Sequence, residues 1–214
     1  MMRILLVRHG QNLANITREF SYRKVDYSLT DLGREQAAHT AAYLATMDLA
    51  AVATSPLRRA METAEPIARV HNLPISVIEG FREINSGDLE GMPPTDENWK
   101  LHDDVMDAWL REEHHARFPG GEDYHGLEAR VAEGLRALVD VPGGPLRVAV
   151  SHGGAIFGMT RFLCPESNVR ELWYSTGIPN CSITEIELDV EGPLRGRLVR
   201  FGDNSHIPGA KPGW

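Results

Sequence analysis

The sequence predicts an α/β domain, a three-layer α/β/α sandwich with a mainly parallel central sheet. Strand-like apolar runs alternate along the chain with segments whose apolar residues recur at helical spacing. Two of these runs, at residues 3–7 and 147–151, are each followed at once or one residue later by a His-Gly pair. Ligands of open α/β sheets bind at the carboxyl ends of strands, so both pairs are expected at one ligand site.

The first strand is expected at residues 3–7, because Ile4-Leu5-Leu6-Val7 is a continuous apolar run typical of a central, buried strand. Thr30 is placed to cap the helix that follows, and Asp31 in its first turn favours the helix dipole. That helix has an apolar stripe at positions i, i+4 and i+7, formed by Ala37, Ala41 and Leu44.

Residues 50–54 and 75–79 are expected to form two further strands, joined by a helix at 57–71 in which Pro66 can introduce a kink. Two longer helices are expected at 95–115 and 124–140. Each has one apolar face, formed in the first by Leu101, Val105 and Ala108 and in the second by Val131, Leu135 and Leu138.

The Pro-Gly-Gly-Pro run at 142–145 ends the last of these helices before the strand at 147–151. Residues 182–189 and 196–201 alternate in polarity and are expected as strands at the sheet edge. The tail at 203–214 is polar and rich in Gly and Pro, so we expect it to be loosely held.

The chain of 214 residues is long enough to bury a full core, and no repeat or linker divides it. We therefore expect a single domain over residues 1–214. Segment 92–122 begins with Pro93-Pro94, ends near Pro119-Gly120-Gly121 and separates two sheet strands. It is expected to be a helical insertion that covers the site.

Composition limits the partners. The net charge of −8 argues against a nucleic acid or a membrane surface. Cys164 and Cys181 have no metal-binding or redox spacing, which favours a reducing compartment. The N-terminal apolar run is too short for a signal peptide or a membrane span, so the cytoplasm is expected. Composition does not predict an oligomeric state.

The two strand ends carry anion-binding chemistry. In Arg8-His9-Gly10, the arginine can hold a phosphate with a planar fork of donors, and a histidine that is neutral near pH 7 can attack phosphorus. The glycine lets the backbone approach an anion closely. Ser151-His152-Gly153-Gly154 repeats the pattern. On an acidic chain, these residues indicate a local anion pocket.

Further motifs follow in a fixed order: Gln11 with Asn15, Leu29-Thr30 with Leu32-Gly33, Ser55-Pro56-Leu57-Arg58-Arg59-Ala60, Arg82-Glu83 with Gly87 and Glu90-Gly91, and Pro119-Gly120-Gly121-Glu122. With the two His-Gly pairs, this order resembles the histidine phosphatase superfamily, also called phosphoglycerate mutase-like, over nearly the whole chain. The resemblance implies a metal-independent enzyme without a cofactor that acts on a small phosphorylated substrate. One departure is Asn12, where the family commonly has Ser or Thr.

The resemblance also implies the roles of the site residues. His9 is the expected nucleophile and forms a phosphohistidine, and Glu83 is the expected proton donor. The expected phosphate-binding residues are Arg8, Asn15, Arg59, His152 and Gly153. Arg59 is favoured over Arg58 because the family's arginine directly precedes Ala, and Glu79 and Glu90 are competing candidates for the acid.

Phosphatase, mutase and a non-catalytic phosphate-binding module all stay open. Segment 92–118 has seven acidic residues against three basic ones, which favours a phosphatase over a cofactor-dependent phosphoglycerate mutase that must hold a bisphosphate. The mutases of the family also have Glu-Arg-x-Tyr-Gly at the acid, where this chain has Glu83-Ile84-Asn85-Ser86-Gly87. Retention of the nucleophile and the acid makes the non-catalytic module the remote alternative.

The expected insertion contains histidines and aromatic residues whose roles the motifs do not assign. His102, His114 and His115 lack the His-Glu-x-x-His spacing, so no metal site is expected. Trp99, Trp109 and Phe118 can either form a wall of the substrate pocket or pack in the core.

Overall fold

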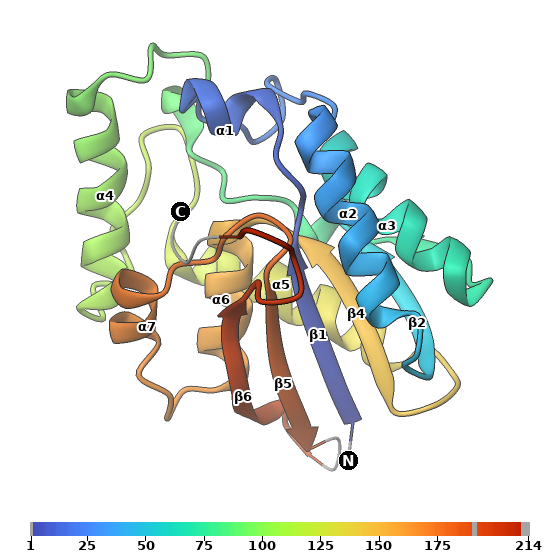
Figure 1. Cartoon of the computed structure of the whole chain (residues 1–214). Helices are drawn as coiled ribbons and strands as arrows, with labels where there is room; N and C mark the ends of the chain where they lie inside the picture. The colour runs from blue at the N-terminus through green and yellow to red at the C-terminus, as the bar shows by residue number, and fades with distance from the viewer. Residues whose placement is uncertain (1, 190–191, 211–214) are drawn as a thin grey trace.

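A six-stranded sheet forms the centre of the computed structural model, which describes residues 2–189 and 192–210 (Figure 1). The strand order is β3-β2-β4-β1-β5-β6. β1, β2, β3 and β4 pair in parallel, whereas β5 and β6 are antiparallel additions beside β1. The strands are β1 (Met2–Arg8), β2 (Leu49–Thr54), β3 (Ile75–Val77), β4 (Leu146–Ser151), β5 (Ile183–Asp189) and β6 (Arg195–Asp203). The predicted fold class is confirmed.

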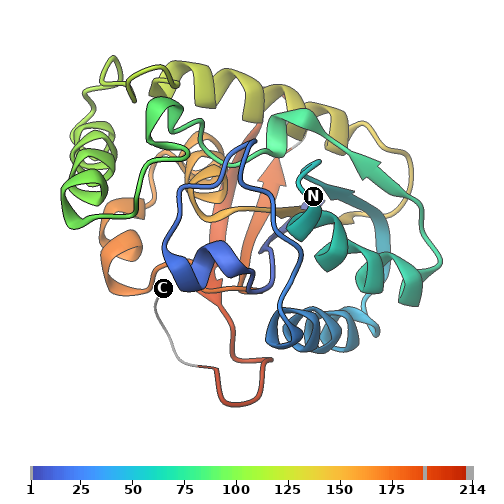
Figure 2. The same ribbon diagram turned by 90° about the horizontal axis from the view of Figure 1, so that it is seen from above.

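Helices cover both faces of this sheet and form the outer layers of the sandwich. Figure 2 shows the sheet between a layer that contains α2 and α3 and a layer that contains α5. The helices are α1 (Leu13–Thr17), α2 (Asp31–Leu44), α3 (Arg58–His71), α4 (Asp96–Leu110), α5 (Tyr124–Val139), α6 (Gly153–Leu163) and α7 (Val169–Ser175). Among the described residues, none of these helices has both the length and the apolar character needed to cross a bilayer.

The apolar run of β1 is buried on both faces because its side chains alternate between two cores. Ile4 and Leu6 pack in a large cluster with residues of α5 and α6, whereas Leu5 and Val7 pack with residues of α2 and α3. All four side chains are fully buried. Burial on both faces fixes the register of β1 beside β4, where Arg8 lies opposite Ser151. The two His-Gly pairs therefore reach the same edge of the sheet.

Several predictions of local structure are wrong. Residues 182–189 do not form an edge strand, because β5 lies between β1 and β6. The helix expected at 95–115 ends at Leu110, where Arg111 caps it and Glu112 has a left-handed φ of 66°. The strand expected at 75–79 ends at Val77, since a 3-10 turn begins at Glu79.

The tail is also better held than expected. Ile207 is buried beside Leu29, Ala37 and Cys181, and the neighbouring His206 contacts Thr40 and Tyr43, so this part of the tail is anchored to the body of the domain. The remainder of the predicted loose tail, 211–214, lies outside the described residues. Helices α1, α6 and α7 were not predicted at all.

Candidate active site

The two histidines of the His-Gly pairs lie side by side at the carboxyl ends of β1 and β4. The backbone N–H of His9 donates to the carbonyl of Ser151 at 2.9 Å, which extends the pairing of the two strands by one residue. The imidazole centroids of His9 and His152 are 5.1 Å apart, and both side chains are buried. The parallel register thus places the two rings together.

His9 is oriented as a neutral imidazole. Its Nδ1 lies 2.7 Å from the carbonyl of Gly10 and donates to it, so Nε2 has the lone pair and accepts from Arg59 Nε at 3.2 Å. Burial, followed by the charges of Arg59 and Arg8, holds the pKa of His9 well below its usual range. At neutral pH, Nε2 is therefore unprotonated and has the lone pair that a nucleophilic nitrogen needs.

The two arginines beside His9 are held by different partners. Arg59 donates from Nη1 to the hydroxyl of Ser21 at 2.8 Å and from Nη2 to its carbonyl at 2.9 Å, and it lies 3.6 Å from Asp26. Burial lowers the pKa of Arg59 to about 10, so it is still charged at neutral pH. Arg8 donates from Nη1 to the carbonyl of Ile178 at 2.5 Å.

Three buried nitrogens at the site have no hydrogen-bond partner among the described residues: Arg8 Nε, Asn12 Nδ2 and His152 Nδ1. His152 is fixed through its other nitrogen, because Nε2 lies 2.7 Å from the hydroxyl of Ser55. Burial is the main cause that holds the pKa of His152 well below its usual range. Buried donors are almost always paired, so an anion such as a phosphoryl group would supply the acceptors that these three nitrogens lack.

Glu83 approaches the same pocket and contacts the first residues of α6. Its Oε1 accepts from the amides of Ile84 at 2.8 Å and Ala155 at 3.0 Å. Oε2 accepts from the amide of Gly154 at a longer distance, 3.3 Å. The helix N-terminus therefore orients the carboxylate. A Cβ on Gly154 would lie 2.4 Å from Ile84 Cδ1 and 2.8 Å from Glu83 Oε1, so glycine leaves the room that both side chains need.

The two competing carboxylates have structural contacts outside the pocket. Glu90 accepts from four consecutive backbone amides of the loop at 22–25, at 2.6–3.1 Å. Glu79 pairs with Arg82 at 2.7 Å. Of the three candidates, only Glu83 lines the pocket.

Asparagines form a network behind the nucleophile. Asn12 and Asn15 cap α1 reciprocally, each side-chain oxygen accepting from the backbone N–H of the other. Asn180 donates to the carbonyl of His9 at 3.0 Å and to Asn15 Oδ1 at 3.2 Å. Asn180, to which the sequence analysis gives no role in the site, lines the pocket together with Asn12, Asn15 and Gly153. It lies three residues before β5, the strand beside β1, and that position was the available signal.

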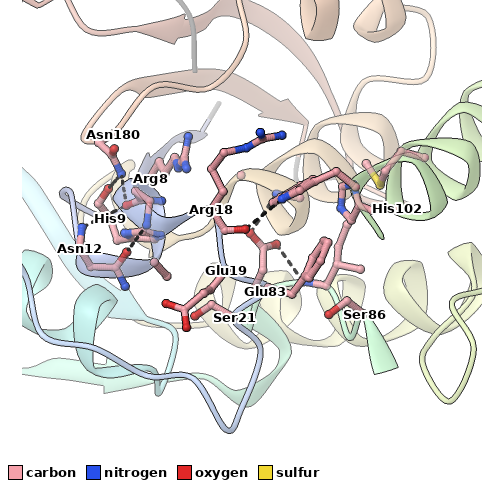
Figure 3. Close-up of a pocket in the computed structure, with 18 of the residues that line it drawn as sticks. Arg8, His9, Asn12, Arg18, Glu19, Ser21, Glu83, Ser86, His102 and Asn180 are labelled. Atoms are coloured by element: carbon pink, nitrogen blue, oxygen red, sulfur yellow. Dashed lines mark hydrogen bonds between the residues drawn. The ribbon is translucent and has the colours of Figure 1, made fainter. Parts of the chain in front are cut away.

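The pocket has a volume of about 730 Å³ and extends well beyond His9. Figure 3 shows Arg8, His9, Asn12 and Asn180 toward one end and His102 toward the other, with Glu83 between them. α4 forms part of the outer wall, so Trp99 lines the pocket, whereas Trp109 and Phe118 are buried in the core. His114 and His115 are not among the lining residues. In the described ranges, no group of three or more His, Cys, Asp or Glu is arranged to hold a metal ion.

Comparison with known proteins identifies the family. The family model described as the histidine phosphatase superfamily (branch 1) matches residues 4–203. The chain belongs to this superfamily. Over 209 residues, 98% of this chain and 98% of the relative, it is 29% identical to the uncharacterized phosphatase PhoE of Bacillus subtilis (strain 168).

Other relatives show both activities of the family. A probable phosphoglycerate mutase, GpmB of Yersinia enterocolitica, is 27% identical over 97% of this chain and 95% of the relative. The solved structure of phosphoserine phosphatase from Entamoeba histolytica in complex with 3-phosphoglyceric acid is 26% identical, with a TM-score of 0.77, over 97% of this chain and 100% of that one. Membership of the family and the phosphatase names support an enzyme that acts on phosphate esters.

Proposed function

We propose that this protein is a metal-independent phosphomonoester hydrolase that acts through a covalent phosphohistidine on His9. The observation that supports the proposal best is the state of His9: a buried, neutral ring whose Nε2 accepts from Arg59 and whose Nδ1 is fixed on the Gly10 carbonyl. Arg8 and Asn12, which line the pocket, and His152, whose ring centroid lies 5.1 Å from that of His9, each have a buried nitrogen without a hydrogen-bond partner among the described residues. Together they provide a nucleophile and an anion cradle built from side chains of this chain.

In the first step, His9 Nε2 attacks the phosphorus, an N–P bond forms and the P–O ester bond breaks. Arg8, Arg59 and His152 would stabilise the phosphoryl oxygens as their charge shifts in the transition state. Glu83 would give a proton to the departing oxygen, so that it leaves as an alcohol. Oε2 is suited to carry that proton, because its single amide contact of 3.3 Å is longer than either contact of Oε1.

In the second step, a water molecule attacks the phosphohistidine, the N–P bond breaks and inorganic phosphate leaves. The Glu83 carboxylate would take the proton of the attacking water, which restores the acid and the neutral His9 for the next cycle. The amides of Gly154 and Ala155 hold the carboxylate in place for both transfers.

The phosphoglycerate mutase activity is the second candidate, and the likeness to GpmB favours it. A mutase must retain a bisphosphorylated intermediate, which requires strong cationic contacts at a second phosphate. Among the described residues that line the pocket, Arg18 is the one lysine or arginine besides Arg8 and Arg59, and it pairs with Asp96 at 3.5 Å. The outer pocket therefore favours hydrolysis.

The experiment is to trap the phosphoenzyme by rapid quench with a ³²P-labelled substrate after exhaustive chelation. We expect an acid-labile, base-stable label on a peptide that contains His9, and His9→Ala should abolish both the label and turnover. A label on His152 would reverse the assigned roles, and activity that is lost on chelation and restored by one metal would refute the metal-independent mechanism. Turnover itself excludes a non-catalytic phosphate-binding module.

The same preparation separates hydrolase from mutase. With 3-phosphoglycerate and 2,3-bisphosphoglycerate supplied together, we expect inorganic phosphate rather than 2-phosphoglycerate. Fast isomerisation that depends on the bisphosphate and releases little phosphate would assign the mutase activity instead.

A further inference from the structure

The outer half of the pocket is lined by aromatic and apolar side chains. Phe20 stacks on Trp99 with ring centroids 4.4 Å apart, and His102 lies within 6 Å of both rings. Met106 and Trp173 complete this wall from α4 and α7. A cavity of about 730 Å³ has far more room than one phosphoryl group needs, so the organic part of a substrate would contact these side chains.

Three carboxylates also line the outer pocket, and none forms an ion pair with a lysine or arginine in the part of the chain that the structure describes. Asp103 contacts the ring nitrogen Nδ1 of His102 at 3.0 Å, Asp107 accepts from the hydroxyl of Tyr174, and Glu19 accepts from Thr17 and Tyr27. None of these hydrogen-bond contacts is with a lysine or arginine, although Arg111 interacts electrostatically with Asp107 at longer range.

Among the described residues that line this wall, the one cation, Arg18, already pairs with a carboxylate. The guanidinium of Arg18 lies 5.6 Å from the centre of the Trp99 ring and 3.5 Å from Asp96, which does not line the pocket. The neighbouring Lys100 pairs with Asp104 at 2.7 Å, and Arg111 pairs with Glu113 at 2.8 Å. Consequently the outer pocket is negative, whereas the inner end around His9 is positive.

Ser86 provides an independent sign that a ligand occupies this region. Its side chain is buried at 5% exposure, and its hydroxyl has no hydrogen-bond partner among the described residues. Ser86 lines the pocket beyond Glu83, away from the inner group around His9 (Figure 3). A substrate whose ester oxygen lies at Glu83 would extend toward this hydroxyl.

On the basis of the function proposed above, we propose that the outer pocket selects phosphomonoesters by the charge of their organic part. An aromatic or apolar group that ends in a cation fits best, an uncharged one is accepted, and one that ends in a second anion is disfavoured. Asp103 and Asp107 supply the selection, and the rings of Phe20 and Trp99 supply the contact area and a favourable face for a cation.

The test uses three phenyl phosphates that differ only at the para position: aminomethyl, ethyl and carboxymethyl. The methylene spacers keep the three phenols similar as leaving groups, so differences in kcat/KM report on the outer pocket. We expect kcat/KM to fall in that order, by about tenfold between the cationic and the anionic ester at low salt, with a smaller spread at high salt.

Adjacent aspartates on α4 provide a matched control. Asp103→Asn and Asp107→Asn should reduce the spread, whereas Asp104→Asn should leave it unchanged, because Asp104 pairs with Lys100 outside the pocket. Equal kcat/KM values for the three esters, a reversed order, or a spread that persists in the Asp103→Asn/Asp107→Asn double variant would overturn the inference while the hydrolase stands. No turnover of any of the three would overturn the proposed function and this inference together.

Discussion

Glu83→Gln separates proton donation from positioning, because the amide keeps most of the contacts of the carboxylate. Glutamine retains an oxygen that can accept from Ile84 and Ala155, at the 2.8 and 3.0 Å contacts of Oε1. Only the 3.3 Å contact with Gly154 is lost, since an NH2 group then faces an N–H. We expect the free energy of unfolding to fall by no more than about 1–2 kcal/mol.

The effect on catalysis should depend on the leaving group. For an alkyl phosphate, whose alkoxide must be protonated as it leaves, we expect kcat/KM to fall by roughly 10²–10⁴, or about 3–5.5 kcal/mol of transition-state stabilisation. For 4-nitrophenyl phosphate, whose leaving group needs little protonation, the loss should stay below about tenfold. The assay is kcat/KM for both esters in parallel, with thermal unfolding as a check of the fold.

Two neighbouring glutamates serve as controls. Glu79→Gln should change neither ester, since Glu79 pairs with Arg82 outside the pocket. Glu90→Gln should slow both esters equally, because Glu90 holds the loop at 22–25, next to the Ser21 that orients Arg59. An equal loss for both esters in Glu83→Gln would refute the donor role, and a loss confined to the alkyl ester in Glu90→Gln would move that role to Glu90.

Three further predictions concern the inner site. Arg59→Lys should lower kcat/KM by about 10² or more, because a lysine cannot form the fork of donors that joins His9 to Ser21. The exposed Arg58→Lys should change kcat/KM by less than about twofold. Steady-state kinetics of the two variants tests this. Gly154→Ala introduces a methyl group 2.8 Å from Oε1 of the acid, so alkyl phosphate hydrolysis should fall more than nitrophenyl phosphate hydrolysis, and kinetics with equal losses would contradict it. Burial lowers the pKa values of His9 and His152 in the folded protein, so below their usual value of 6.5 the unfolded chain binds protons that the native state does not. The free energy of unfolding should therefore decrease as pH falls from 6.5, by up to about 2.7 kcal/mol per pH unit for the pair, and denaturant unfolding of the His9→Asn/His152→Asn variant should show a flatter slope.

The inner site was largely predictable because its position follows from local sequence patterns. The runs before His9 and His152 are apolar without interruption, and burial on both faces leaves β1 and β4 one register. Parallel strands of one sheet bring their carboxyl ends together, so the two histidines had to meet. Arg59 was separated from Arg58 by the resemblance to the family alone; in the structure, Arg59 is buried at His9, whereas Arg58 is exposed.

The parts that could not be predicted depend on packing or on backbone amides far away in the sequence. α6 has no apolar stripe to detect, because it is buried on nearly all sides and starts with two glycines. The sequence therefore did not predict the hydrogen bonds from the N-terminus of α6 to Glu83, nor those from the loop at 22–25 to Glu90. β5 alternates in polarity like an edge strand, yet β6 pairs with its outer side.

The outer pocket shows why a charge count over a segment is a weak guide to specificity. The excess of acidic residues in segment 92–118 favoured a phosphatase, but basic residues neutralise several of these acids, in the pairs Lys100–Asp104, Arg111–Glu113 and Arg161–Glu112. The acidic residues of this segment that face the cavity, and that a substrate would contact, are Asp103 and Asp107. Those two residues are one helical turn apart on α4, so the rotation of that helix about its axis, fixed by Met106 and Trp109 in the core, decides which charges select the substrate.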